Sequence, residues 1–282
     1  MEKIAVVVDS GSDVNENLAK GLDIFSLPLR ISIDGKEYTD GIDITAQEVF
    51  DVLDSAKVTT SLPTGEDIIN TFEKLKGEGY THIIAVAISS GLSGTFNVMR
   101  NLSNAVDGLE VYVFDTKNIS LGSGLLALHA AEMVKDGATF SEIVSSLESK
   151  LNDSEVFFTV GSLDYLLKGG RIGLVAGTVA NVLNIKPIIS CNDEGVYYTV
   201  SKVRGYGRVI KKMVDAAAKF VGDHNDYKVY LLNADSKENF DEIKDYVLSK
   251  FNHLSSVEVI NITPALAIHT GPEALGIAII KK

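Results

Sequence analysis

The sequence contains very little cysteine and no cluster of metal-binding side chains. Cys191 is the single cysteine in 282 residues, so no disulfide can form within the chain, as is typical of a reducing compartment. The five histidines are scattered, without a close pair or a cysteine partner, and this spacing argues against a zinc site. We therefore expect no metal ion and no cofactor.

Long hydrophobic runs are absent as well, and basic residues are in the minority. No apolar stretch approaches the roughly 18 residues of a membrane-spanning helix, and the N-terminus has no basic segment before a cleavable apolar core. Lysine and arginine number 26 against 38 aspartates and glutamates, which gives a formal net charge of -12. Such an acidic chain is a poor candidate for binding nucleic-acid phosphates or anionic membrane surfaces. We expect a soluble cytoplasmic protein with no membrane insertion and no nucleic-acid partner.

The composition and pattern that are present are those of a globular α/β protein. Hydrophobic residues make up 45% of the chain and charged residues 23%. Apolar runs typical of buried strands occur at Ile4 to Val8, Ile83 to Ile88 and Val111 to Phe114, and a helical pattern follows each. This alternation continues to about residue 150 and predicts a parallel sheet with helices on both faces.

The pattern changes in the second half of the chain. Asn192 to Gly195 separates two apolar runs and predicts a β-hairpin, so antiparallel pairing is expected here. A helix is expected from Leu174 to Leu183. Because 282 residues suffice for two ordinary domains, we predict an N-terminal α/β domain over residues 1–152 and a C-terminal mixed α/β domain over residues 153–282.

A turn of small residues, Ser89 to Thr95, follows the strand Ile83 to Ile88 and precedes a helix expected from Phe96. Open α/β sheets bind ligands at the carboxyl ends of their strands, and the free N–H groups of a helix start favour an anion. The anion could be a phosphate or a carboxylate. Ser93 could instead be a nucleophile, since Gly91 to Thr95 nearly matches the Gly-x-Ser-x-Gly elbow but lacks its last glycine. The simplest alternative is a hydroxyl that only caps the helix.

Two further turns carry polar residues with different explanations. Ser12 or Asp13 is expected to cap a helix from Val14 to Leu22, which gives these residues a local role. Thr60 and Ser61 have no such role, because they precede Leu-Pro in extended backbone. Their hydroxyls are therefore candidates for ligand contacts.

Three basic residues also have both a functional and a structural interpretation. Arg171 follows two glycines, where it could be a rigidly placed cation or an exposed C-capping side chain. His269 precedes Thr-Gly-Pro, a constrained turn in which a neutral imidazole can donate a hydrogen bond to a carboxylate, although a lone histidine is more often structural. Arg204 reads from sequence alone as an ordinary exposed strand end.

Several of these segments occur together in one order along nearly the whole chain. As a set they resemble the DegV family of bacterial fatty-acid-binding proteins, some of which are the acyl-carrying subunit of a fatty acid kinase that serves phospholipid metabolism. Each motif is short, and the ordered set carries the resemblance. The segments are Val8-Asp9-Ser10-Gly11-Ser12-Asp13, Thr60-Ser61-Leu62-Pro63, Ser89-Ser90-Gly91-Leu92-Ser93-Gly94-Thr95, Leu166-Leu167-Lys168-Gly169-Gly170-Arg171-Ile172, Lys186-Pro187, Lys202-Val203-Arg204 and His269-Thr270-Gly271-Pro272.

The resemblance implies two α/β domains with a long-chain fatty acid in the cleft between them and its tail in an apolar tunnel. Its carboxylate would be held by hydroxyls at helix starts. A buried carboxylate needs several hydrogen-bond donors, while the tail contributes about 0.8 kcal/mol per buried CH₂. The residues implied for the carboxylate end are Thr60, Ser61, Ser93, His269, the amides of Gly94 and Thr95, and Arg171.

The resemblance also implies a partner. A separate, dihydroxyacetone-kinase-like fatty acid kinase would phosphorylate the presented carboxylate, docking at Arg204. This chain has no Walker motif of its own, which fits a monomeric, non-enzymatic carrier. Gly205-Tyr206-Gly207 stands where a more basic or hydroxyl-bearing segment is usual in the family, and this departure weakens the case for docking relative to that for lipid binding.

The main alternative is a serine esterase or acyltransferase that uses Ser93 and His269. Such a site needs a base within hydrogen-bond reach of the nucleophile and an acid that orients the base. Asp9 and Asp115 are candidate acids, but the sequence does not place them. Binding of a phosphosugar is a third possibility.

Overall fold

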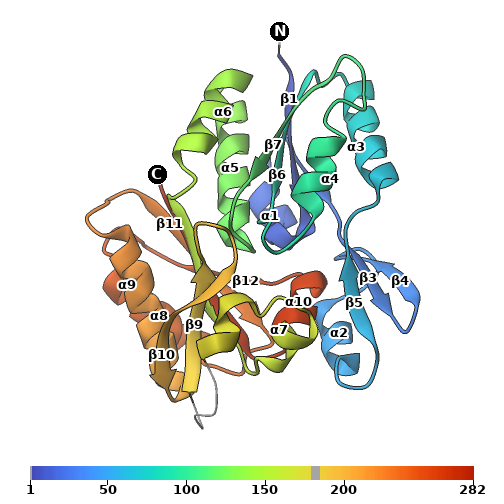
Figure 1. The fold of residues 1–282 in the computed structure, drawn as a ribbon. Coiled ribbons are helices and arrows are strands. Elements are labelled where there is room, and N and C mark those ends of the chain that lie inside the picture. Colours follow the sequence, from blue (N-terminus) through green and yellow to red (C-terminus); the bar gives the residue numbers. More distant parts are fainter. Residues whose placement is uncertain (1, 179–184) are drawn as a thin grey trace.

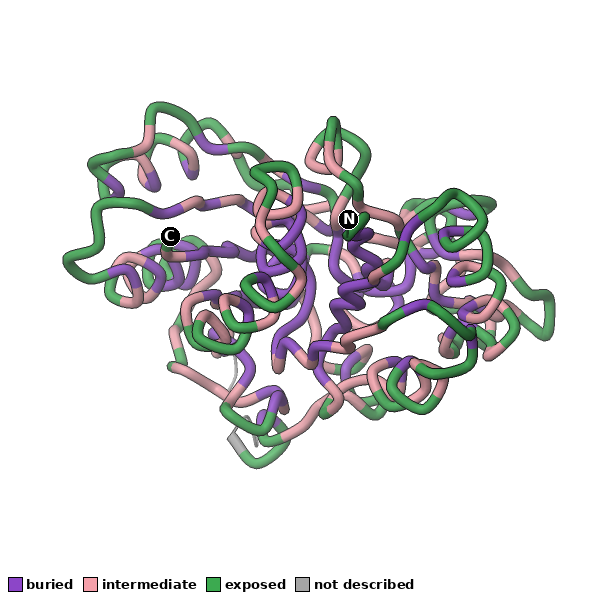
Figure 2. The backbone as a smooth tube through the Cα atoms, turned by 90° about the horizontal axis from the view of Figure 1, so that it is seen from above, coloured by how far each residue is buried: buried purple, intermediate pink, exposed green. Residues whose placement is uncertain are grey.

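Two sheets lie on either side of one buried helix (Figure 1). The computed structural model describes residues 2–178 and 185–282. Helix α5 (Leu121–Lys135) packs against strands of both sheets, and ten of its residues are buried. A helix with apolar residues on all sides is stable only where every side is covered, and the position between two sheets provides that cover. Figure 2 shows the buried backbone gathered along the middle of the molecule and the exposed residues at its periphery.

The first sheet is four-stranded and parallel, with strand order β2-β1-β6-β7. β1, one of its two central strands, is buried at every residue, as expected for a parallel strand covered on both faces. α3 (Gly65–Gly77) and α4 (Thr95–Asn101) cover the outer face through Phe72 and Met99. α6 (Phe140–Ser149) packs beside α5. The strands are β1 (Ile4–Asp9), β2 (Ile24–Leu27), β6 (His82–Ala87) and β7 (Glu110–Asp115).

The second sheet is six-stranded and mixed, with strand order β10-β9-β8-β13-β11-β12. Only the β11–β12 pair is parallel, and the expected hairpin joins β9 to β10. α8 (Tyr206–Val221) and α9 (Phe240–Lys250) cover its outer face. The predicted fold class, a parallel N-terminal sheet and a mixed C-terminal one, is therefore confirmed. The strands are β8 (Ser154–Thr159), β9 (Ile185–Cys191), β10 (Tyr197–Arg204), β11 (Tyr227–Ala234), β12 (Glu258–Asn261) and β13 (Ala274–Lys281).

A third, small antiparallel sheet projects from the first half of the chain, with order β4-β3-β5. Asp34 and Gly35 both have positive φ, of 50° and 85°, which is the geometry of a tight hairpin turn. This sheet matters for function because β5 ends in the Thr60-Ser61 pair. Its strands are β3 (Arg30–Ile33), β4 (Lys36–Thr39) and β5 (Val58–Ser61).

Three helices start at a threonine whose side chain caps them. Thr45, Thr64 and Thr139 each form a capping box with the acidic residue three positions later. These boxes open α2 (Ala46–Val52), α3 and α6.

The helix expected from Val14 to Leu22 is present only as one short turn, and the prediction of its cap is wrong. The structure has a 3₁₀ turn, η1 (Ser10–Ser12), and a short α1 (Glu16–Ala19), whose cap is Asn15. Neither Ser12 nor Asp13 caps α1, because Asp13 has a left-handed backbone, with φ of 52°, and its carboxyl group bonds elsewhere in the molecule.

Two other stretches differ from expectation. α10 (Pro264–Thr270) is a helix where only a constrained turn was expected, and it starts with proline at its first position, a common arrangement. The helix expected from Leu174 to Leu183 overlaps the 3₁₀ helix η2 (Gly173–Thr178), and its remainder, residues 179–183, lies outside the described residues. α7 (Asp164–Lys168) precedes η2, as the leucine spacing predicts. In the part of the chain that the structure describes, no helix is long and apolar enough to cross a membrane.

Gly271, which ends α10, gives a test of this packing. Its φ of 67° and ψ of -179° belong to a region that is essentially restricted to glycine, and a Cβ there would lie 2.1 Å from the Tyr165 ring. We expect Gly271→Ala to lower the free energy of unfolding by roughly 3 kcal/mol, measured by urea denaturation, since strain and a clash add. The control is Gly77→Ala, at the end of α3 with no atom within 4 Å of the new Cβ, which should change stability by less than about 1 kcal/mol. Equal urea midpoints for both variants would contradict this account.

Candidate functional site

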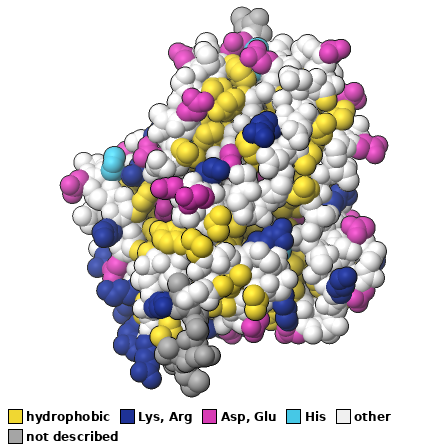
Figure 3. Space-filling view, in the orientation of Figure 1, with side chains coloured by type: hydrophobic (Ala, Val, Ile, Leu, Met, Phe, Trp, Pro, Cys, Tyr) yellow, Lys and Arg dark blue, Asp and Glu magenta, His cyan; other side chains and the backbone are white. Residues whose placement is uncertain are grey.

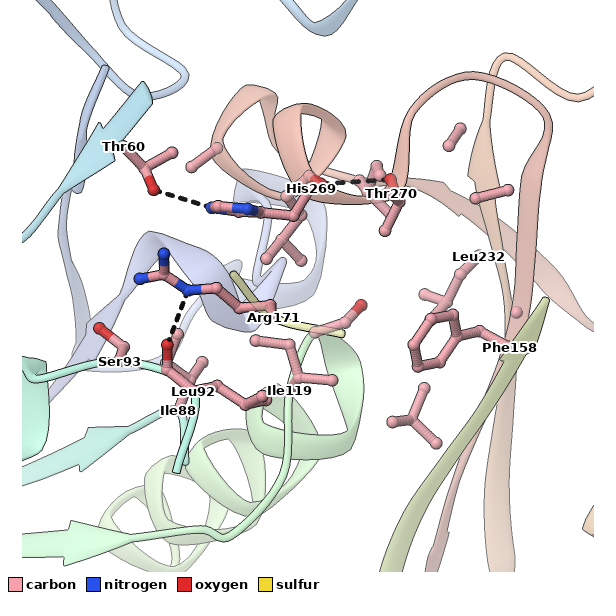
Figure 4. Close-up of a pocket in the computed structure, with 18 of the residues that line it drawn as sticks. Thr60, Ile88, Leu92, Ser93, Ile119, Phe158, Arg171, Leu232, His269 and Thr270 are labelled. Atoms are coloured by element: carbon pink, nitrogen blue, oxygen red, sulfur yellow. Dashed lines mark hydrogen bonds between the residues drawn. The ribbon is translucent and has the colours of Figure 1, made fainter. Parts of the chain in front are cut away.

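A largely apolar cavity of about 1070 Å³, its open mouth included, lies between the two sheets (Figure 4). Ile88 and Ile119 line it from the first half of the chain, and Phe158 and Leu232 line it from strands of the second sheet. The cavity is therefore a hollow in a core to which both halves contribute, because all four residues belong to one hydrophobic cluster.

Several polar residues of this cavity lie together at one end, and two further hydroxyl residues, Ser120 and Thr270, also line it. Figure 4 shows Thr60, Ser93, Arg171 and His269 together on one side, while Phe158 and Leu232 lie on the other. Ser61 lines the same cavity. The structure thus brings together five of the predicted site residues from β5, the loop before α4, the loop after α7 and α10.

His269 shares a hydrogen bond of 2.8 Å between its Nε2 and the Thr60 Oγ1. Its Nδ1 is buried and, among the described residues, has no hydrogen-bond partner. A Cβ on Gly169 would lie 2.2 Å from that nitrogen, so the imidazole packs directly on the glycine backbone. Burial, and to a lesser extent the charge of Arg171, lowers the pKa of His269 to about 4. The imidazole is therefore neutral at neutral pH.

Arg171 is held by two backbone carbonyl groups. Its Nε donates to the Leu92 oxygen at 3.2 Å, and its Nη1 donates to the Gly169 oxygen at 2.7 Å. Leu92 belongs to the turn after β6, whereas Gly169 follows α7, so the guanidinium ties the two halves together at the polar end of the cavity. This placement answers the question left open by the sequence, since the side chain lines the cavity and is not simply exposed.

Ser93 sits just before α4 and bonds within its own turn. Its Oγ shares a 2.9 Å hydrogen bond with the Thr95 hydroxyl and accepts one of 3.3 Å from the Thr95 amide. The N-cap of α4 is Gly94, which offers no side-chain cap. Gly94 and Thr95 do not line the cavity in the described structure, but they adjoin Ser93, which does.

The hydrogen bonds of a serine-hydrolase triad are not formed among the residues that the structure describes. The Nε2 of His269 is engaged by Thr60, and its Nδ1 has no acid beside it. Asp9 accepts a hydrogen bond from the amide of Ile88. Asp115 pairs with Lys117 and accepts from the amide of Ser90. Neither candidate acid orients the histidine.

A second cavity, of about 1040 Å³ with its open mouth, adjoins the first. Thr60, Arg171 and His269 line both cavities and so form part of the wall between them. The other polar residues of the second cavity include Lys57, Lys168 and Asp54. The polar end of the first cavity is therefore approachable from a more polar side.

Arg204 is not part of either cavity. It is exposed at the end of β10, where the chain enters α8. The structure thus separates it from the five residues at the polar end.

Sequence reasoning missed most of the apolar wall and two buried aspartates, Asp13 and Asp40, that contact α10. The wall residues are ordinary core residues in every local pattern, so no signal distinguished them. Asp40 lies in a Thr-Asp-Gly segment for which no local role was found, and that lack of a role is the same signal that identified Thr60 and Ser61. In residues 2–178 and 185–282, no group of three or more His, Cys, Asp or Glu is placed to hold a metal ion.

Comparison with known proteins gives consistent results. The profile of the DegV family, described as uncharacterised proteins, matches residues 3–282. A DegV domain-containing protein of Clostridium acetobutylicum is 41% identical over 285 residues, covering 100% of both chains.

Solved structures show the same fold. A fatty-acid-binding DegV family protein of Thermus thermophilus superposes with a TM-score of 0.92 at 28% identity, covering 99% of this chain and 100% of that one. A stearic acid-binding protein of Eubacterium ventriosum superposes with a TM-score of 0.87 at 30% identity, covering 100% of this chain and 99% of that one. On its sequence and its fold, this chain belongs to the DegV family.

Proposed function

We propose that this protein binds a long-chain fatty acid without a covalent bond, with the tail in the cavity between the sheets. The observation that carries the proposal is the polarity of that cavity. It is apolar over most of its wall, and the Thr60 and Ser93 hydroxyls, the His269 imidazole and the Arg171 guanidinium lie together at one end. An amphiphile with one anionic head and one unbranched tail matches this division.

The head group would be an ionised carboxylate at the Thr60 end. A buried carboxylate requires several donors, which the hydroxyls of Thr60, Ser61 and Ser93 can supply together with the Gly94 and Thr95 amides. Neutral His269 would orient the Thr60 hydroxyl through their hydrogen bond. Arg171 would add a positive charge whose position is fixed by two carbonyls.

The tail would provide most of the affinity. Each buried CH₂ contributes about 0.8 kcal/mol, so a chain of ordinary lipid length offers far more than the binding needs. The similarity to a stearic acid-binding protein supports an acid of that size, because that structure shares this fold over almost its whole length. In this proposal the protein is a cytoplasmic, monomeric fatty-acid carrier whose two domains meet near residue 152.

We further propose that the bound acid is presented to a separate, dihydroxyacetone-kinase-like fatty acid kinase. The second cavity supports this step, since it reaches Thr60 and His269 from the side opposite the tail. A basic face supports docking on an otherwise acidic chain. Figure 3 shows lysine and arginine side chains gathered at the lower left, and β10 and α8 carry exposed Lys202, Arg204, Arg208, Lys211 and Lys212 in that region.

In this proposal the protein is a carrier and not an enzyme. The esterase alternative needs a base on Ser93 and an acid on His269, and the hydrogen bonds described above supply neither.

Native mass spectrometry of the purified protein tests the central claim. We expect an adduct with the mass of a long-chain fatty acid that disappears on denaturation in solvent, because the acid is held without a covalent bond. An adduct that survives denaturation would instead identify an acyl-enzyme, with Ser93 as the nucleophile. A bare protein that also fails to take up added fatty acid would contradict lipid binding altogether.

Removing one hydroxyl should weaken the head-group site. We expect Thr60→Val to lower the affinity for oleic acid about tenfold or more, since a hydrogen bond to a charged group is lost at nearly constant volume. Titration calorimetry of the delipidated protein gives the affinity. The control is Thr71→Val in α3, where the hydroxyl bonds only to its own helix, and there the affinity should stay unchanged. An unchanged affinity in Thr60→Val would refute the assigned polarity of the cavity.

The charge of His269 provides a pH test. In the lipid-free protein its pKa, lowered by burial and Arg171, should be about 4. Because the unfolded chain binds this proton near pH 6.5, the stability present above that pH is lost as the pH falls toward 4. A bound carboxylate favours the imidazolium, so ¹⁵N NMR should show a higher His269 pKa with oleic acid than without it. Exposed His224 should give the same signals in both samples, and an unchanged His269 titration would place the carboxylate elsewhere.

A further inference from the structure

Helix α10 carries His269 in its last turn, and its first turn is held by two aspartates from the other half of the chain. The amide of Thr263 donates to Asp13 Oδ1 at 2.7 Å, and the amide of Ala265 donates to Asp40 Oδ1 at 2.8 Å. Thr263 occupies the N-cap position, yet its own side chain does not cap the helix. Asp40 therefore satisfies the N–H group that a threonine cap at Thr263 would normally serve, and Asp13 satisfies the N–H group of the N-cap residue itself, which in a capping box bonds to a side chain three positions later.

Each aspartate is itself fixed by a serine hydroxyl. Asp13 accepts from Ser120, at the start of α5, and Asp40 accepts from Ser10 at 2.6 Å. Both aspartates are only 3% exposed. Each carboxyl group thus bridges two segments, with one oxygen on α10 and the other on the first half of the chain. A bridge with both oxygens engaged holds its two ends in a defined geometry.

The opposite end of α10 is tied to the same half of the chain. His269 bonds to Thr60 on β5, and α10 also packs against α2 and α7. The helix is therefore held at its start by Asp13 and Asp40 and near its end by Thr60. A seven-residue helix is about 10 Å long, so a tilt of only about 6° about its first turn would move His269 by about 1 Å. Such a shift takes a 2.8 Å hydrogen bond beyond its useful range.

We propose that Asp13 and Asp40 are positioning residues that set the place of His269, and through it of the Thr60 hydroxyl, in the carboxylate end of the cavity. The inference rests on the proposed function, because it concerns the same head-group site. Neither aspartate lines the cavity in the described structure. Their effect is on the recognition of the carboxylate and not on the apolar tunnel.

Burial supports this assignment. Burial raises the pKa of Asp13 to about 7 and also raises the pKa of Asp40, so keeping these groups inside costs stability as the pH rises toward neutral. If the Thr263 hydroxyl capped the helix instead, no carboxyl group would have to be buried there, and this loss of stability would not arise. Unlike a local threonine cap, the two carboxyl groups also link the two halves of the chain.

The test compares two ligands that differ only in the head group, oleic acid and oleyl alcohol. In Asp40→Ala we expect the affinity for oleic acid to fall about tenfold and that for oleyl alcohol to change less than about threefold. Asp40→Asn should restore most of the selectivity, because its carbonyl oxygen can still accept from Ala265. In a His269→Ala background, Asp40→Ala should cause no further loss of selectivity, since Asp40 acts through that histidine.

A matched control removes a partly buried carboxyl group that lies on β8 and not beside α10. Glu155 accepts from Ser190 on β9, and burial raises its pKa to about 7 as well. Glu155→Ala should keep the selectivity of the wild type for acid over alcohol. If it loses that selectivity as Asp40→Ala does, the effect belongs to buried carboxyl groups in general and the proposal is overturned.

The remaining outcomes separate this inference from the proposed function. Wild-type protein that binds neither ligand refutes the proposed function. Wild-type protein that prefers oleic acid, with Asp40→Ala unchanged or equally weakened for both ligands, overturns the positioning role alone. If Asp40→Ala does not fold, Asp40→Ser takes its place, because its hydroxyl is too short to bridge Ser10 and Ala265. The proposal would also be overturned if Asp40→Ser reduced the selectivity by the same factor in the His269→Ala background as in the wild-type background.

Discussion

The burial of α5 between the two sheets is the constraint on which the rest of the structure depends. Because the helix is apolar all round, both sheets must cover it, and residues of both sheets then form one hydrophobic cluster. The two halves of the chain meet through a shared core and not through a polar interface. The cavity is a hollow in that core, placed where the carboxyl end of β6 approaches the second sheet. In the proposed function, the lipid tail fills the hollow and completes the core.

In the proposed function a chain with a formal charge of -12 holds an anion, and the same arrangement explains how. Net charge acts over long distances and is screened, whereas a buried carboxylate is stabilised by the donors that touch it. Hydroxyls from the end of β5 and from the turn before α4 converge with the guanidinium of Arg171 at one end of the cavity because the shared core fixes the elements that carry them. His269 remains neutral there, so it can orient a hydroxyl without adding charge when no ligand is present.

Local patterns predicted most of the elements, because capping boxes, apolar runs and turn residues act over a few positions. Three helices began where a threonine and an acidic residue stood three apart. Part of the site was predictable because Thr60 and Ser61 have no local partner in the sequence, and the lack of a local role made their hydroxyls candidates for ligand contacts. The role of Asp13 was not predictable, because its partner Thr263 is 250 residues away and the sequence offered a nearer helix to cap. The short helix α10 was missed because its stability comes from those distant caps and from packing.

A polar side chain that is at least partly buried and has no local partner therefore has the same meaning in both parts of this site. Thr60 forms a hydrogen bond with His269, 209 positions away in the sequence, and Asp40 accepts one from the amide of Ala265, 225 positions away. Each of these bonds joins the first half of the chain to the one short helix that closes the polar end of the cavity. Burying a polar group is costly unless it is paired, so such groups persist where a long-range bond needs a defined geometry. The carboxylate end needs that geometry more than the tail does, because hydrogen bonds are directional and apolar contacts are not.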